Sequence, residues 1–156
     1  MSWPGFAGPM LRPETRTRAR ALQLLYAWET GGRQPVASLS PGLAGLIGPA
    51  PRLPQGAAAR GEVLAAAVEL AEGVLGDLNQ IDRLCADASE HWRLDRVAAI
   101  ERNLLRLGTY ELLRQAAPPK VVIDQALWLA HRFGGPQSAA FVNGVLDRIA
   151  RTLGRL

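Results

Sequence analysis

Arginine is the residue type best suited to do chemistry in this chain. The sequence has 156 residues, a formal net charge of +4 and 18 basic residues, of which only Lys120 is a lysine. A guanidinium carries a planar set of donors that fits phosphate oxygens and stacks on bases, so the arginine excess favours RNA as a partner. A genome rich in G and C would enrich arginine as well, together with alanine, glycine and proline. The placement of the arginines therefore matters more than their number.

The first expected helix, residues 15–29, has its arginines near the start. Its apolar residues recur at helical spacing and form one stripe, made of Ala21, Leu24, Leu25 and Trp28. On a helical wheel Arg16, Arg20 and Tyr26 lie on the opposite side, and Arg18 flanks the stripe. Arginines beside an aromatic ring can hold phosphates and stack on a base, which makes this face a candidate RNA-binding surface. A basic face that is merely solvated explains the same pattern equally well.

The start of the last expected helix is a second candidate for binding. The turn Gly135-Pro136-Gln137-Ser138 leaves helix N-terminal amides open, which suits a phosphate group. Further along, Phe141-Val142-Asn143-Gly144 places an amide and a glycine inside an otherwise good helix. Glycine there costs about 1 kcal/mol relative to alanine, and close packing of another helix on Gly144 is the favoured explanation. Asn143 is expected to hydrogen-bond to a neighbouring segment of the chain.

Residues that could support catalysis are scarce. His91 and His131 are far apart in sequence, and neither has a partner at metal-ligand spacing. The single cysteine, Cys85, excludes an internal disulfide and a cysteine-rich zinc site. No phosphate-binding loop, dinucleotide-binding glycine motif or nucleophile elbow is present. We therefore expect a binding protein rather than an enzyme, with no cofactor and no metal.

The elements that must position these residues are helices. Five substantial helices are expected, at residues 15–29, at 61 to about 91, from Asp95 as N-cap to about 115, at 120–133 and at 137–153. No strand pattern is found, so an all-α helical bundle is expected. Eleven of the thirty residues in 31–60 are glycine or proline, which predicts a long loop or insertion with a short helix near residues 43–47. Residues 1–14 are expected to form a flexible tail before a single helical domain, 15–156.

Targeting features point to the cytoplasm. No apolar run is long enough to span a membrane. The first thirteen residues lack the basic start and apolar core of a signal peptide. A cytoplasmic protein without a membrane partner is the resulting expectation.

Three stretches carry a recognisable family pattern. The first is the run from Arg18 to Tyr26, and the second is Ile100-Glu101-Arg102-Asn103-Leu104-Leu105-Arg106-Leu107 with the following Tyr110-Glu111-Leu112. The third extends from Pro119 to the closing run Phe141-Val142-Asn143-Gly144-Val145-Leu146-Asp147, which is the most specific of the three. Together, over residues 16–29 and about 62–150, they resemble the NusB family of bacterial transcription antitermination factors. Asp124-Gln125 departs from the Asn-Glu that this family usually shows.

The resemblance implies a NusB-like helical bundle of two small subdomains. It also implies a heterodimer with NusE, a small-subunit ribosomal protein that doubles as a transcription factor. The pair would bind the boxA element of ribosomal RNA leaders, and RNA polymerase carrying that complex would resist termination and support rRNA transcription.

Site residues carried over from the family fall into three groups. Arg16, Arg18 and Tyr26 match RNA-facing positions of the first helix, to which the wheel adds Arg20. At the start of the last helix, the RNA-side positions are matched by Gln137, Ser138 and Phe141. Glu101 matches a carboxylate that faces NusE, and Asp95 is expected near it.

Two other functions remain open from the sequence. NusB-like domains also occur as RNA-binding modules ahead of an rRNA cytosine methyltransferase, in which case this chain would be a fragment. A structural helical protein with a solvated basic face, which does not bind RNA, is the third reading. Some relatives form homodimers that hide the RNA-binding face, and the sequence leaves that state open.

Overall fold

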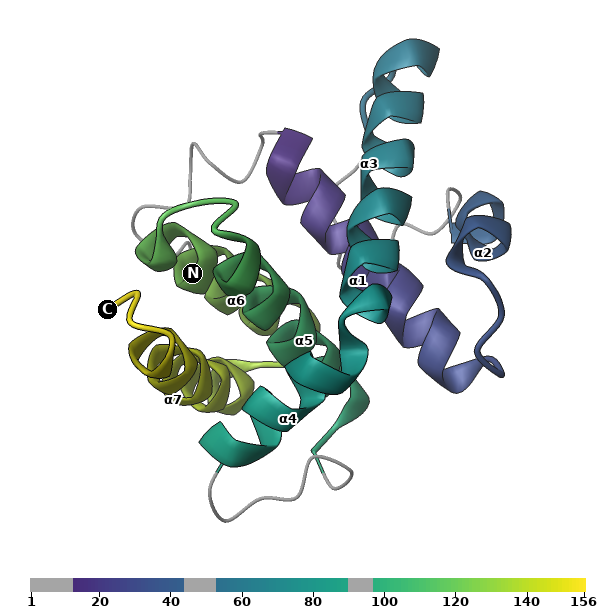
Figure 1. Cartoon of the computed structure of the whole chain (residues 1–156). Helices are drawn as coiled ribbons and strands as arrows, with labels where there is room; N and C mark the ends of the chain where they lie inside the picture. The colour runs from purple at the N-terminus through teal and green to yellow at the C-terminus, as the bar shows by residue number, and fades with distance from the viewer. Residues whose placement is uncertain (1–12, 44–52, 90–96) are drawn as a thin grey trace. The chain divides into compact units, whose positions relative to one another are not determined.

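Every regular element of the described chain is an α-helix, as the periodicity predicts. A computed structural model describes residues 13–43, 53–89 and 97–156, and no strand occurs within these ranges (Figure 1). The helices are α1 (Pro13–Thr30), α2 (Val36–Leu43), α3 (Ala57–Gly76), α4 (Leu78–Ala88), α5 (Ala99–Arg114), α6 (Pro119–Phe133) and α7 (Pro136–Thr152). The chain divides into two compact units, Met1–Glu72 and Gly73–Leu156, with the division inside α3. The prediction of an all-α fold is confirmed.

The first unit contains α1, α2 and most of α3, and α1 packs against α2. On α1 the expected stripe is buried, with Ala21 and Leu25 fully inaccessible and Trp28 at 9% exposure. Helix α3 buries one face at the spacing of an amphipathic helix, through Val63, Ala67 and Ala71.

The short helix expected near residues 43–47 falls, apart from Leu43, on residues outside the described part of the chain, and a helix that was not expected, α2, precedes that stretch. Helix α2 begins at Val36 and ends at Leu43, and α3 begins at Ala57. Residues 44–52 lie outside the described part of the chain. The density of glycine and proline hides the helical pattern of α2 in the sequence. Ser38 closes the first turn of this helix. The Ser38 hydroxyl and amide both donate to the Pro35 carbonyl, at 2.7 and 3.0 Å.

The second unit is built around α5. Helix α5 packs against α4, α6 and α7, and α7 also packs against α4 and α6. As a result α5 is buried on all sides from Asn103 to Thr109, and only its ends are more open. Gly108 permits a close approach of α7, since a Cβ at this position would lie 2.8 Å from a methyl carbon of Leu146.

Two helix boundaries differ from the sequence expectation. The stretch expected as one long or kinked helix from residue 61 is two helices, α3 and α4, which are separated at Asp77. Helix α5 begins at Ala99 with Ala98 in the N-cap position, so Asp95 is not its N-cap. Asp95 itself lies outside the described residues. The N-cap expectation was wrong because Ala98, which has no side-chain acceptor, occupies that position.

Candidate nucleic-acid and partner interface

The arginines of α1 differ in their accessibility. Arg16 and Arg18 are half-buried, and the Nε of Arg16 is buried without a hydrogen-bond partner in the described part of the chain. Arg20 is 2% exposed, and its Nη1 donates to the Gln23 side-chain oxygen at 3.1 Å. Burial lowers the pKa of the Arg20 guanidinium below its usual value. The wheel placed Arg20 on the open face with Arg16, and the structure contradicts that placement: only Arg16 and Arg18 retain accessible surface among the three.

Tyr26 supplies the aromatic surface of this helix. Its side chain is 42% exposed, which is unusual for a large aromatic residue in this chain. The Thr30 hydroxyl donates to the Tyr26 carbonyl at 2.8 Å and ties down the last turn of α1. Just beyond, the exposed Arg33 guanidinium stacks over the Trp28 ring at 4.7 Å from its centroid. Arg33 escaped the sequence reasoning because it lies outside the helix, at a positive φ of 61° after Gly31-Gly32.

The start of α7 brings the second set of predicted RNA-binding residues together on one turn. Gln137 is exposed, while Ser138 and Phe141 are half-buried. Gly135 is the N-cap residue at φ 134°, a conformation that glycine adopts freely, and no side chain caps the helix. The first-turn amides of α7 therefore have no side-chain acceptor. These three residues belong to the second unit, whereas the α1 residues belong to the first.

The interpretation of Gly144 as a packing residue was wrong, whereas the hydrogen bond expected for Asn143 stays a prediction. Both residues are exposed on α7. A Cβ on Gly144 would meet no atom within 4 Å among the described residues. No helix of the second unit therefore requires a glycine at this position.

The first turn of α5 carries Glu101. The carboxylate is half-buried and lies at the N-terminal end of the helix, where a negative charge is favourable. Neighbouring side chains hold this turn by bonds to main-chain carbonyls. Arg102 donates to the Val97 carbonyl, and the Asn103 amide donates to the Ala99 carbonyl at 2.9 Å.

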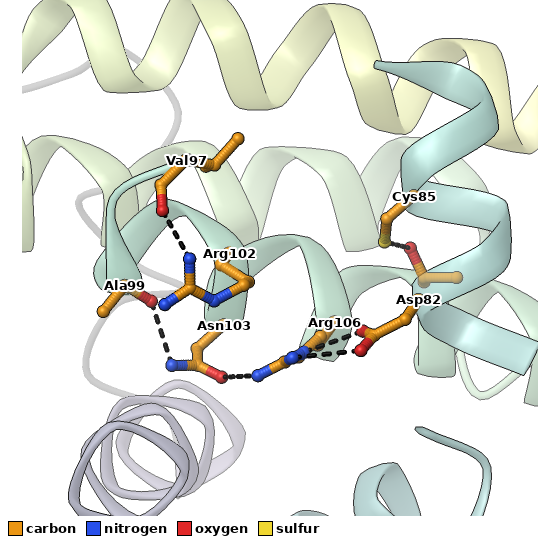
Figure 2. Close-up of polar contacts among 8 residues, drawn as sticks. Asp82, Cys85, Val97, Ala99, Arg102, Asn103 and Arg106 are labelled. Atoms are coloured by element: carbon orange, nitrogen blue, oxygen red, sulfur yellow. Dashed lines mark hydrogen bonds and ion pairs between the residues drawn. The ribbon is translucent and has the colours of Figure 1, made fainter. Parts of the chain in front are cut away.

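A buried polar network lies directly behind that turn, between α5 and α4 (Figure 2). The Arg106 guanidinium donates twice to the Asp82 carboxylate, at 2.8 and 3.0 Å, and once to the Asn103 side-chain oxygen, at 3.0 Å. Arg106 is 5% exposed and Asn103 is fully buried. The sequence reasoning missed this network, although the spacing of Asn103 and Arg106 by three positions places them on one face of a helix.

Groups capable of catalysis or metal binding are sparse in the described ranges. No group of three histidine, cysteine or carboxylate side chains there could hold a metal ion. Burial raises the pKa of the Cys85 thiol to about 12, and its Sγ lies 3.4 Å from the Thr109 hydroxyl. This thiol is therefore protonated at neutral pH and is a poor nucleophile. His131 is exposed near the end of α6, and His91 lies outside the described residues. None of the described helices is long and apolar enough to cross a membrane.

Comparison with known proteins identifies relatives over most of the chain. A model of the NusB family matches residues 15–151. The transcription antitermination protein NusB of Sorangium cellulosum is 44% identical over 140 residues, which are 89% of this chain and 92% of that protein. The NusB structure from T. maritima is 32% identical, with a TM-score of 0.69 and coverage of 87% of this chain and 90% of that chain.

A third relative has been solved in a complex. It is a crystal structure of the antitermination factors NusB and NusE with double-stranded RNA, to which this chain is similar with a TM-score of 0.71. Sequence identity is 23%, and the similarity covers 92% of this chain and 99% of that chain. At this identity the likeness supports the fold.

Proposed function

The chain belongs to the NusB family of transcription antitermination proteins, and we propose that it binds boxA-type RNA of ribosomal RNA leaders as a heterodimer with NusE. Family membership confirms the expectation of a transcription factor rather than an enzyme. The proposed activity belongs to the cytoplasm, where the RNA-bound pair would join RNA polymerase and prevent termination. The match over residues 15–151 carries this proposal, because it includes every candidate site residue.

The RNA contacts are proposed for two surfaces. On α1, Arg16 and Arg18 hold phosphates and the exposed Tyr26 ring stacks on a base. The uncapped start of α7 provides the second surface, through Gln137, Ser138 and Phe141. Half-exposed arginines, the 42% exposed tyrosine and free first-turn amides support this assignment. Arg20 is assigned a supporting role, because its burial leaves little of the guanidinium accessible to RNA.

The partner contact is proposed for the first turn of α5. Glu101 would face a basic or polar group of NusE, and Asp95 would lie near it. The half-buried carboxylate at a helix N-terminus and the rigid turn that carries it support this role.

Fluorescence anisotropy of variants with single substitutions tests the proposed RNA surface. The reaction contains a boxA-type RNA, NusE and wild-type chain, Arg18→Ala or Tyr26→Ala. Loss of one phosphate contact should weaken binding and reduce the dependence of log Kd on log salt by about one. Loss of one stacked base should weaken binding by about 5- to 150-fold, from roughly 1–3 kcal/mol per base.

Arg151→Ala is the matched control for these variants. Arg151 is exposed at the end of α7 and, among the described residues, pairs within its own helix, with the Asp147 carboxylate at 2.9 Å. Its removal should leave the affinity and the salt dependence unchanged. If Arg18→Ala and Tyr26→Ala behave like Arg151→Ala, the proposed RNA surface on α1 is wrong.

A further inference from the structure

The turn that carries Glu101 marks the point where α5 passes from half-exposed to buried. Residues 99–102 are half-buried, whereas Asn103 and the residues that follow are inaccessible. A helix end is normally its least constrained part, because its first amides and last carbonyls lack partners within the helix. Any contact that restrains this turn therefore also restrains the position of Glu101.

The Asn103 side chain connects this turn to the core. Its amide nitrogen donates to the carbonyl of Ala99 in the first turn, and its oxygen accepts from Arg106. A guanidinium has only donors, so Arg106 fixes which end of the Asn103 amide faces it and which faces Ala99. Arg106 is itself fixed by two bonds to Asp82 of α4. Figure 2 shows this continuous path from Asp82 through Arg106 and Asn103 to Ala99.

We propose that Asn103, oriented by the Arg106–Asp82 pair, is a positioning residue for partner binding. It holds the first turn of α5 in its bound conformation before NusE arrives, so that Glu101 is presented without further ordering. This inference rests on the proposed function of Glu101. A rigid binding segment loses less conformational entropy on association, which strengthens binding without adding a contact.

A double-mutant cycle on NusE binding tests the proposal. Titration calorimetry compares wild type, Asn103→Ala, Glu101→Gln and the double variant. We expect Asn103→Ala to weaken binding by about 2- to 12-fold, from the roughly 0.5–1.5 kcal/mol of one ordered side chain. We further expect Glu101→Gln to weaken binding less in the Asn103→Ala background than in wild type, because the turn is then no longer held.

Two further variants separate positioning from stability. Asn103→Asp retains an acceptor for Arg106 but cannot donate to the Ala99 carbonyl, so it breaks the link to the first turn while it keeps a partner, now charged, for Arg106. Thr109→Val is the matched control, because Thr109 is also fully buried on α5 and contacts Cys85 of α4 far from the first turn. Asn103→Asp should reproduce the loss of affinity, and Thr109→Val should not.

Hydrogen exchange of the free chain provides a readout that does not involve the partner. The Arg102 amide donates to the Ala98 carbonyl at 2.9 Å, and its exchange should accelerate in Asn103→Ala and Asn103→Asp but not in Thr109→Val. Additive effects in the cycle, or equal exchange in all variants, would overturn the positioning role. If Glu101→Gln leaves NusE binding unchanged, the proposed partner contact fails, and the exchange measurement alone decides whether Asn103 holds the turn.

Discussion

Gly73 and Tyr110 approach each other so closely that a Cβ on Gly73 would lie 2.3 Å from the Tyr110 hydroxyl oxygen and 2.6 Å from the ring carbon that bears it. The Tyr110 ring, on α5, therefore packs directly against Gly73 near the end of α3. The Arg114 guanidinium lies over the Tyr110 ring, 5.5 Å from its centroid, and pairs with the Asp77 carboxylate at 2.7 Å. The contact explains why a glycine occupies this position inside a helix.

Gly73→Ala should destabilise the chain by about 1–3 kcal/mol, because the Tyr110 ring has to move out of a well-packed position. Chemical denaturation measures the change. Gly76→Ala, in the same helix, is the control: a Cβ there meets nothing within 4 Å, and the free energy of unfolding should stay equal or rise. Equal stability of the two variants would show that the tyrosine moves without cost.

Two ion pairs of the second unit, Arg106–Asp82 and Arg114–Asp77, should differ in strength. Arg106 is 6% exposed at its side chain and binds Asp82 with two bonds, whereas Arg114 in the pair with Asp77 is 58% exposed. Asp82→Ala should therefore lower the free energy of unfolding by about 1.5–3 kcal/mol, since it leaves a buried guanidinium without its carboxylate. Asp77→Ala should lower it by about 0–1 kcal/mol. Denaturation of the two variants side by side gives the comparison, and a larger loss for Asp77→Ala would contradict it.

Stability should fall with alkaline pH through Cys85. Burial, and to a smaller degree the Asp82 charge, raise the pKa of this thiol from 9.0 to about 12. Above pH 9 the unfolded chain loses the thiol proton while the folded chain keeps it, so the unfolded state binds fewer protons and is favoured as pH rises. The free energy of unfolding of wild type should decline by up to about 1.4 kcal/mol per pH unit more steeply than that of Cys85→Ala between pH 9 and 12. Parallel pH profiles for the two proteins would refute this.

Gly144→Ala should stabilise the folded chain. The position is exposed inside α7 and a Cβ meets no atom within 4 Å among the described residues, so alanine brings a gain of about 0.5–1 kcal/mol. Thermal denaturation measures the shift in Tm. A lower Tm would contradict the open surroundings of Gly144.

The fold was predictable because helical periodicity extends over most of the chain. The apolar stripe from Ala21 to Trp28 located α1 within two residues. The helix-breaking runs Pro118-Pro119 and Gly134-Gly135-Pro136 located α6 and α7 within two residues as well. Helix α2 was not expected because proline and glycine dominate the composition around it. The hydrogen bond from the Ser38 hydroxyl to the Pro35 carbonyl cannot be recognised from the periodicity of the sequence.

The candidate site was predictable at the level of helices and less so at the level of side chains. A helical wheel assumes that one face is buried, but α1 buries Arg20 as well as its apolar stripe. Similarly, Gly144 looked like a packing position because local sequence cannot reveal whether a neighbouring helix is present. The Asp82–Arg106 pair joins residues 24 positions apart, and only tertiary structure brings them together.

Anisotropy with a boxA-type RNA is the sharpest test of joint RNA recognition by this chain and NusE. The chain is titrated alone and then at saturating NusE, at two salt concentrations. We expect salt-sensitive binding that NusE tightens by about 5- to 150-fold, a coupling of roughly 1–3 kcal/mol. Absence of RNA binding both with and without NusE would contradict the function while leaving the fold and family unchanged.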